Sequence, residues 1–213
     1  MRWLYYLVIV GCPLPSMAEI DGLNNNWQQV KNENNIQVYT IDQPGTDIVK
    51  AKAVALIHAP LISIQQTLDD LDSRPEWIPF LVHSKIVSEQ SANEKVEYSL
   101  FSAPWPASDR DFIYSVKRDE LVDGELGSLD KRVYNMHSIE YAQIPPGGGI
   151  IRGEIFESVY RLVAVNKKLT RVEIIYHADP KGWLPGWIIN IIQRAFPYQM
   201  MRNLKNKMEE VEP

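Results

Sequence analysis

The sequence predicts an α+β fold in which a curved antiparallel β-sheet wraps around a long C-terminal α-helix. Residues 83–178 form short runs of alternating apolar and polar side chains separated by turn residues, which is typical of consecutive antiparallel strands. Residues 186–208 then carry one broad apolar stripe at helical spacing. A sheet that curves around this helix would bury the stripe economically, so we expect the two to share one core.

The beginning of the chain is expected to lie outside this fold. A positively charged start is followed by an apolar run over residues 3–11, and Ser16-Met17-Ala18 resembles a small-residue cleavage site. The run is about half of the ~20 residues needed to span a bilayer. We therefore expect residues 1–18 to be a signal peptide and residues 19–213 to form a single domain, in a protein that is exported to a periplasm or secreted.

Cys12 is the only cysteine of the chain, and it lies inside the predicted signal peptide. Cleavage after Ala18 would leave no thiol for a disulfide or for nucleophilic catalysis. Ile9-Val10-Gly11-Cys12 also resembles a lipoprotein box, in which Cys12 would carry a lipid anchor. The short apolar run and Pro13 favour the cleaved peptide over the anchor.

Composition limits the kinds of partner. The formal net charge is −5 and the isoelectric point is about 5.4, which argues against nucleic acid, because nucleic-acid binding usually demands a basic face. No internal repeat or second domain is evident, and we expect a monomer.

The elements expected before residue 83 are, in order, a short helix, two strands and a second helix: residues 24–33, 36–40, 49–58 and 60–75. Trp27 and Val30, three positions apart, suggest the first helix, and Gln43-Pro44-Gly45 supplies the turn between the strands. Pro60 can open the second helix at its first turn. The apolar face of that helix consists of Leu61, Ile64, Leu68 and Leu71.

Six strands are expected in the meander, over residues 83–88, 95–102, 112–118, 131–142, 150–164 and 170–178. The C-terminal helix starts after Pro185, and Pro197 is expected to kink it because proline lacks an N–H and clashes with the preceding turn.

Sequence patterns that carry enzyme chemistry are missing. His58, His83, His137 and His177 are far apart and show no metal-ligand spacing. Gly147-Gly148-Gly149 precedes a strand rather than a helix, so it is not a phosphate loop. We therefore expect no metal, no cofactor and no catalytic residue.

Three segments in order resemble the START family of lipid-transfer domains over roughly residues 24–208. Trp105-Pro106-Ala107-Ser108-Asp109-Arg110-Asp111-Phe112 looks like the family's W-P-x-S-x-R-D-F turn and strand. Gly149-Ile150-Ile151-Arg152 is similar to its G-x-x-R strand start. Asp179-Pro180-Lys181-Gly182-Trp183-Leu184-Pro185, followed by Trp187 to Asn190, resembles its D-x-x-G-x-x-P turn and helix.

The resemblance implies a helix-grip fold and a tunnel that holds one lipid, a phospholipid, fatty-acyl lipid or sterol, with transient contact to a membrane surface during transfer. The resemblance and the strand alternation together give these cavity candidates: Phe112, Tyr114, Val116, Arg152, Phe156, Ser158, Tyr160, Leu162, Val172, Ile174 and Tyr176. The lid candidates on the helix are Trp187, Ile188, Ile191, Ile192, Ala195 and Phe196.

One family feature is only half present. Sterol-carrying relatives often have an acidic residue thirteen positions before the arginine of the R-D-F motif and a basic partner six positions after it. The same count here reaches Glu97 and Val116. A buried carboxylate without a partner is costly, so either Glu97 faces solvent or another cation, such as Arg152 or Arg118, compensates. This pattern does not favour a sterol in particular.

Two alternatives to a lipid carrier stay open. A helix-grip enzyme of the cyclase or hydrolase kind would need an acid or base inside the cavity, for which His137, His177, Glu97 and Tyr160 are the candidates. An envelope interaction protein without a ligand would show a filled core and an exposed apolar patch.

Overall fold

The computed structural model describes residues 26–119, 130–185, 188–189 and 191–211. The predicted signal peptide and Trp187 lie outside these ranges, so those two predictions are not tested.

Ten strands within the described ranges form one sheet, in the order β1-β2-β3-β10-β9-β7-β6-β5-β4, with β8 paired to β6. Neighbours along this path are antiparallel, as predicted, whereas β8 pairs with β6 in parallel. The strands are β1 (Gln28–Glu33), β2 (Ile36–Ile41), β3 (Lys50–Ile57), β4 (Leu81–Ser91), β5 (Glu94–Phe101), β6 (Arg110–Arg118), β7 (Lys131–Ser138), β8 (Ile151–Arg152), β9 (Glu154–Asn166) and β10 (Leu169–Asp179).

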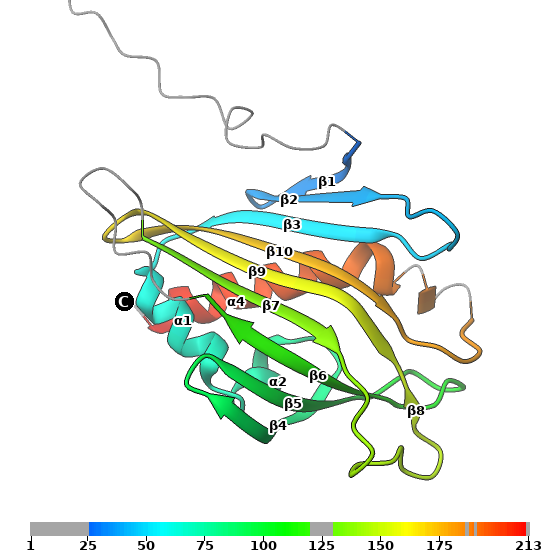
Figure 1. Cartoon of the computed structure of the whole chain (residues 1–213). Coiled ribbons are helices and arrows are strands. Elements are labelled where there is room, and N and C mark those ends of the chain that lie inside the picture. The colour runs from blue at the N-terminus through cyan, green and yellow to red at the C-terminus, as the bar shows by residue number, and fades with distance from the viewer. Residues whose placement is uncertain (1–25, 120–129, 186–187, 190, 212–213) are drawn as a thin grey trace, which may run out of the picture.

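The sheet curves around the C-terminal helix (Figure 1), which confirms the predicted fold class. A π-helical turn, η2 (Ile191–Ala195), leads into α4 (Phe196–Val211), which lies along one face of the sheet. Pro197, which was expected to kink the helix, is the second residue of α4. The change from π- to α-helix falls between Ala195 and Phe196, one residue before the proline.

The expected helix over residues 60–75 is divided into α1 (Leu61–Asp69) and α2 (Arg74–Trp77). Leu61, Ile64 and Leu68 are buried, as the apolar spacing indicated. The break lets α2 turn Trp77 into the core, where its side chain is 1% exposed.

The N-terminal helix predicted for residues 24–33 is wrong, because Gln28–Glu33 form β1. Asn34 and Asn35 both have positive φ, and they turn the chain from β1 into β2. A bulge between Gln29 and Lys31 inserts Val30 as an extra residue. The bulge interrupts the strand alternation, and the resulting pattern resembled helical spacing.

The main core lies between the sheet and α4. Met200, Met201, Leu204 and Met208 of α4 pack there with apolar side chains from β2, β3, β6, β7, β9 and β10. A smaller cluster around Val96, Tyr98 and Ile113 lies on the other face of β5 and β6, beneath residues 139–144. The two faces of β6 therefore contribute to separate cores.

Candidate functional site: an apolar cavity between the sheet and the C-terminal helix

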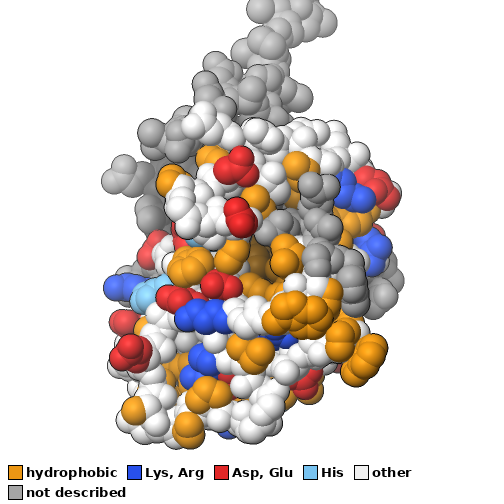
Figure 2. Space-filling view, turned by 90° about the vertical axis from the view of Figure 1, so that its right-hand side faces the viewer, with side chains coloured by type: hydrophobic (Ala, Val, Ile, Leu, Met, Phe, Trp, Pro, Cys, Tyr) orange, Lys and Arg blue, Asp and Glu red, His pale blue; other side chains and the backbone are white. Residues whose placement is uncertain are grey.

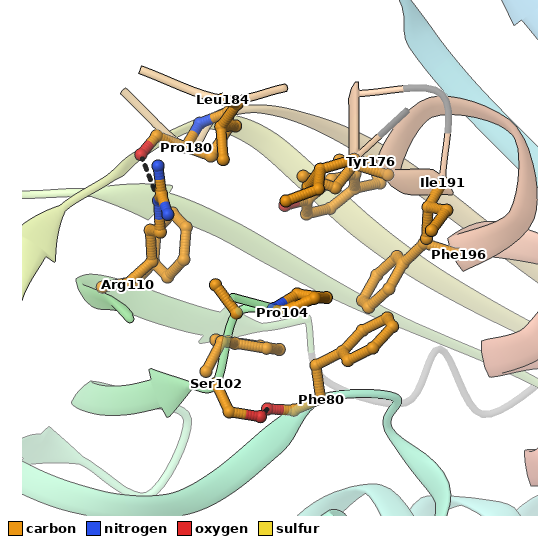
Figure 3. Close-up of a pocket in the computed structure, with 14 residues that line it drawn as sticks. Phe80, Ser102, Pro104, Arg110, Tyr176, Pro180, Leu184, Ile191 and Phe196 are labelled. Carbon is orange, nitrogen blue, oxygen red and sulfur yellow. Dashed lines mark hydrogen bonds between the residues drawn. The ribbon is translucent and has the colours of Figure 1, made fainter. Parts of the chain in front are cut away.

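An apolar cavity of about 80 Å³ lies where the start of the C-terminal helical segment crosses the ends of β5, β6 and β10. The rings of Phe80, Tyr176 and Phe196 converge on this space (Figure 3). Of its described lining residues, Arg110 alone carries a charge. The lining consists of Phe80, Phe101, Ser102, Ala103, Pro104, Arg110, Phe112, Tyr176, Pro180, Leu184, Ile188, Ile191, Ile192 and Phe196.

The end of the molecule that carries the cavity is partly apolar on its surface. Figure 2 shows hydrophobic side chains around a hollow near the middle of this face, with charged side chains around them. Trp105 and Trp183, 89% and 69% exposed, adjoin the lining residues Pro104 and Leu184 in sequence. Large exposed rings beside an apolar hollow mark a surface suited to contact with another apolar phase.

Arg110 fixes one side of the cavity mouth. Its guanidinium donates hydrogen bonds to the carbonyl oxygens of Pro180 (3.3 Å), Lys181 (3.2 Å) and Trp183 (3.2 Å), and to that of Ser108. Burial lowers the pKa of Arg110 from its ordinary value. The guanidinium therefore holds the turn after β10 against the turn before β6.

The next residue, Asp111, points to the opposite face of β6. Its carboxylate accepts two hydrogen bonds from Arg152, at 2.6 and 3.0 Å, and Arg152 also donates to the carbonyl oxygen of Ile144. This bidentate ion pair joins β6 to β8. Arg152 is thus engaged away from the cavity, contrary to its expected place in the lining.

Phe112 packs against Gly153, directly after the Gly149-Ile150-Ile151-Arg152 segment. A Cβ placed on Gly153 would lie 2.3 Å from a ring carbon of Phe112, so the ring occupies space that only glycine leaves free. Gly153 also separates β8 from β9, which were expected to form one strand over residues 150–164.

Glu97 faces the interior and is fully buried, which settles its orientation. Its partner is Arg74 of α2, with contacts of 2.6 and 3.3 Å, and Lys95 is 3.0 Å away. Burial alone would raise the pKa of Glu97, but Arg74 and Lys95 hold it below its usual range. The compensating cation is therefore neither Arg152 nor Arg118.

Tyrosines surround this buried ion pair. Tyr114 donates a hydrogen bond to Glu97 (3.1 Å), and burial raises its pKa, with the negative charge of Glu97 adding to the effect. Burial likewise raises the pKa of Tyr160 to about 12. An ionised carboxylate held by two cations, beside phenols that stay protonated, is poorly suited to proton transfer near neutral pH.

A family model described as the START domain matches residues 15–210. The chain belongs to the START domain family. Members of this family bind and transfer lipids.

Relatives of this START domain are distant in sequence. An uncharacterised protein of Pseudomonas aeruginosa is 23% identical over 210 residues, 99% of this chain and 100% of that protein. A phosphatidylcholine transfer protein of Rattus norvegicus is 25% identical over 169 residues, 78% of this chain and 75% of that one. The relatives also include an acetyl-coenzyme A thioesterase of Mus musculus, so some proteins similar to this chain are enzymes.

The human StAR-related lipid transfer protein 5 has the same fold. Its solved structure superposes with a TM-score of 0.78 over 92% of this chain and 93% of that one, at 17% identity. At this identity the match establishes the helix-grip fold and leaves the ligand open.

The structure divides the START-domain residues expected to line a cavity or lid into three groups. Those that line the cavity are Phe112, Tyr176, Ile188, Ile191, Ile192 and Phe196. Those that lie in or against the main core, or buried beside it, are Tyr114, Val116, Ser158, Tyr160, Leu162, Val172 and Ile174. Those that lie elsewhere are Arg152, Phe156 and Ala195.

Phe156 lies on the outer face because β9 carries a bulge. In the pairing with β10, His177 is opposite Glu157 and Ala178 is opposite Ile155, so Phe156 is the extra residue. Phe156 is 43% exposed, and its ring packs at a tilt against that of His177, with 4.8 Å between the ring centroids. Alternation counted through a bulge assigns such a residue to the wrong face.

The lining also contains residues that sequence reasoning missed, chiefly Phe80, Phe101, Pro180 and Leu184. Phe101 could have been found, because it alternates with Glu97 and Ser99 on the interior face of β5. Phe80 has a positive φ of 65° at the end of the α2 turn, and no local pattern indicated that conformation.

Two further features concern the described residues only. No group of three or more His, Cys, Asp or Glu side chains among them could hold a metal ion. None of the helices they form has the length and apolar character needed to cross a membrane.

Proposed function

We propose that this protein binds one hydrophobic lipid between the sheet and the segment from Leu184 to Phe196, and carries it between membranes. The apolar cavity is the observation that supports this function. Transferring a methylene group out of water gains about 0.8 kcal/mol, so a carrier needs a comparably dry interior. The described lining offers such an interior, because its side chains are mostly aromatic and aliphatic. Its one charged residue, Arg110, already donates hydrogen bonds to backbone carbonyl oxygens.

We further propose that the protein acts after export, in a periplasm or outside the cell. The apolar run at residues 3–11 and the cleavage-like Ser16-Met17-Ala18 support this location. Trp105 and Trp183 would contact the membrane surface while the lipid enters or leaves, since exposed tryptophan rings favour the interface between water and lipid.

The test is native mass spectrometry of the purified protein, with extraction and identification of any bound lipid. We expect one lipid per protein molecule, and transfer of a labelled lipid between donor and acceptor vesicles. Protein that neither retains nor takes up lipid would contradict the proposal.

An enzyme is the second candidate, because some relatives are enzymes. The cavity lining offers no pair of acid and base groups among its described residues, and His137 and His177 lie outside it. Turnover of an acyl ester or thioester that is abolished by Glu97→Gln, with the fold intact, would favour this candidate over the carrier.

A further inference from the structure

A second hollow, called here the β1 groove, lies between the edge strand β1 and the C-terminal helical segment. It shares no described lining residue with the apolar cavity. Its volume is about 640 Å³, within the roughly 300–1,000 Å³ that is typical of ligand pockets. The described side chains that line it include Val30, Lys31 and Glu33 of β1, Ala195 of η2, and Tyr198 and Arg202 of α4.

The register of β1 turns two of its charged side chains toward the helix. Lys31 is opposite Val38 and Glu33 is opposite Ile36. Val38 and Ile36 are fully buried in the core on the inner face of β2, and residues directly opposite in paired strands point to the same face. The edge of the sheet therefore presents a cation and a carboxylate where the next strand presents apolar side chains.

Two cations converge on the ring of Tyr198. The Nζ atom of Lys31 lies 4.2 Å from the ring centroid, and the Cζ atom of Arg202 lies 5.8 Å from the same centroid. The side chain of Asn34 donates a hydrogen bond of 2.8 Å to the Tyr198 hydroxyl, which holds the ring in place. Positive charges this close repel each other, so an anion that contacts both of them would be bound favourably.

The carboxylate in the β1 groove pairs with one of the two cations. Glu33 is 2.7 Å from Lys31. Arg202 forms no ion pair with a carboxylate of the described residues, and its side chain donates a hydrogen bond of 3.3 Å to Asn203. Arg202 is exposed, so a ligand can reach its guanidinium. The described lining thus has a surplus of positive charge, in a chain whose formal net charge is −5.

These side chains suit a phosphate group attached to an organic part. A guanidinium binds phosphate oxygens through two parallel hydrogen bonds, and an ammonium adds a compact charge. Val30, the extra residue of the β1 bulge, is 47% exposed at the groove and offers apolar contact beside the cations. Bulges commonly re-aim a side chain in this way next to functional sites.

We infer that the β1 groove binds an organic phosphate, either a soluble phosphate ester or the headgroup of an anionic lipid, between Lys31 and Arg202. The site is separate from the apolar cavity, so it does not depend on the proposed function.

The test uses one probe for each source of phosphate. Calorimetric titration with glycerol 3-phosphate probes the soluble ester, and sedimentation with phosphatidylcholine vesicles, with and without phosphatidylglycerol, probes the headgroup. Arg202→Gln and, separately, Lys31→Gln each remove one cation of the groove. Lys168→Gln is the matched control, because Lys168 is exposed in the turn between β9 and β10. We expect either groove variant to weaken binding about tenfold, and the control to change it by about twofold at most.

Glu33→Gln separates a ligand site from a purely structural ion pair. The change removes the carboxylate that competes with the phosphate for Lys31, so we expect binding to become about threefold tighter. If the pair only fastened the edge strand, the same change would leave phosphate binding unchanged or weaker, and either result would overturn the site. Circular dichroism of each variant checks that the fold is retained.

The two probes also distinguish the ligands. Binding of glycerol 3-phosphate that depends on Arg202 would support a soluble ester. Binding to phosphatidylglycerol vesicles alone, with the same dependence on Arg202, would support a lipid headgroup. Binding of neither probe, or equal losses in Arg202→Gln and Lys168→Gln, would overturn the site and leave the charges of β1 with the role of protecting an exposed sheet edge.

Discussion

Three consecutive residues at the start of β6 together bind two other parts of the chain, residues 152–153 and 180–183. Arg110 holds the turn at Pro180–Trp183, Asp111 holds Arg152, and Phe112 fills the space beside Gly153. Strand alternation makes this possible, because adjacent side chains point to opposite faces. The short segments that carry the family resemblance thus contact one another directly. These contacts explain why the segments occur together, without a separate function for each.

Gly153→Ala should destabilise the protein by about 2 kcal/mol, because the added methyl group would overlap the Phe112 ring. Urea unfolding followed by circular dichroism measures the change. Gly148→Ala is the matched control, since a Cβ there meets no atom within 4 Å. Equal stability of the two variants would contradict the packing described for Phe112.

Arg74→Ala should destabilise the fold by about 3–5 kcal/mol, because it leaves the buried carboxylate of Glu97 with Lys95 as its remaining cation. Replacing both partners, as Arg74→Met with Glu97→Leu, should be less harmful than the single change, since no charge is then left buried. A double variant that unfolds as easily as Arg74→Ala would show that the ion pair is not the cause.

At the scale of elements, the antiparallel meander and the C-terminal helix were predictable, because each depends on local periodicity. The pairing of Glu97 with Arg74 was not, since it joins β5 to α2 across a turn that no local pattern specifies. The bulges at Val30 and Phe156 also escaped prediction. A bulge interrupts the alternation from which strand faces are inferred, so these two errors share one physical cause.

The segment that closes the cavity yields the element-scale prediction. Ile192→Arg should leave the protein folded, because Ile192 is only partly buried, yet it should abolish lipid uptake by placing a charge in the cavity wall. Ile62→Arg is the control, since Ile62 is 52% exposed on α1. Uptake of a fluorescent lipid from vesicles measures the effect. Normal uptake by Ile192→Arg would exclude this segment from the site.

At the scale of the whole molecule, stability should fall as the pH falls below neutrality. Burial and the nearby Lys50 lower the pKa of His177 in the folded state, so the unfolded chain binds a proton there first and stability declines below about pH 6.5. The pKa of Glu97 is also lowered, and its contribution is lost as the pH falls below about 4.3.

Urea midpoints between pH 4 and pH 8 would measure this decline. His177→Gln should flatten the part of the curve between about pH 7 and pH 5.5 and leave the steeper acid part in place. An unchanged slope in His177→Gln would assign that part of the decline to other groups.

The tryptophans at the cavity end should govern contact with membranes. Replacing Trp105 and Trp183 together by serine should weaken sedimentation with phosphatidylcholine vesicles, because both rings are exposed and both residues adjoin lining residues of the cavity in sequence. Ile62→Ser removes an exposed apolar side chain elsewhere and should have little effect. Equal vesicle binding by the double variant and the wild type would refute membrane contact at this end.

The contacts of Arg110, Asp111 and Phe112 also determine which changes the chain tolerates in combination. Each short segment is complementary to the other two, so a segment transplanted alone from a distant relative would meet the wrong partners. Chimaeras that exchange residues 104–112, 149–153 and 179–185 as a set should therefore fold better than those that exchange any one of them. Substitutions in these three segments at the cavity mouth are accordingly expected to be tolerated as linked sets.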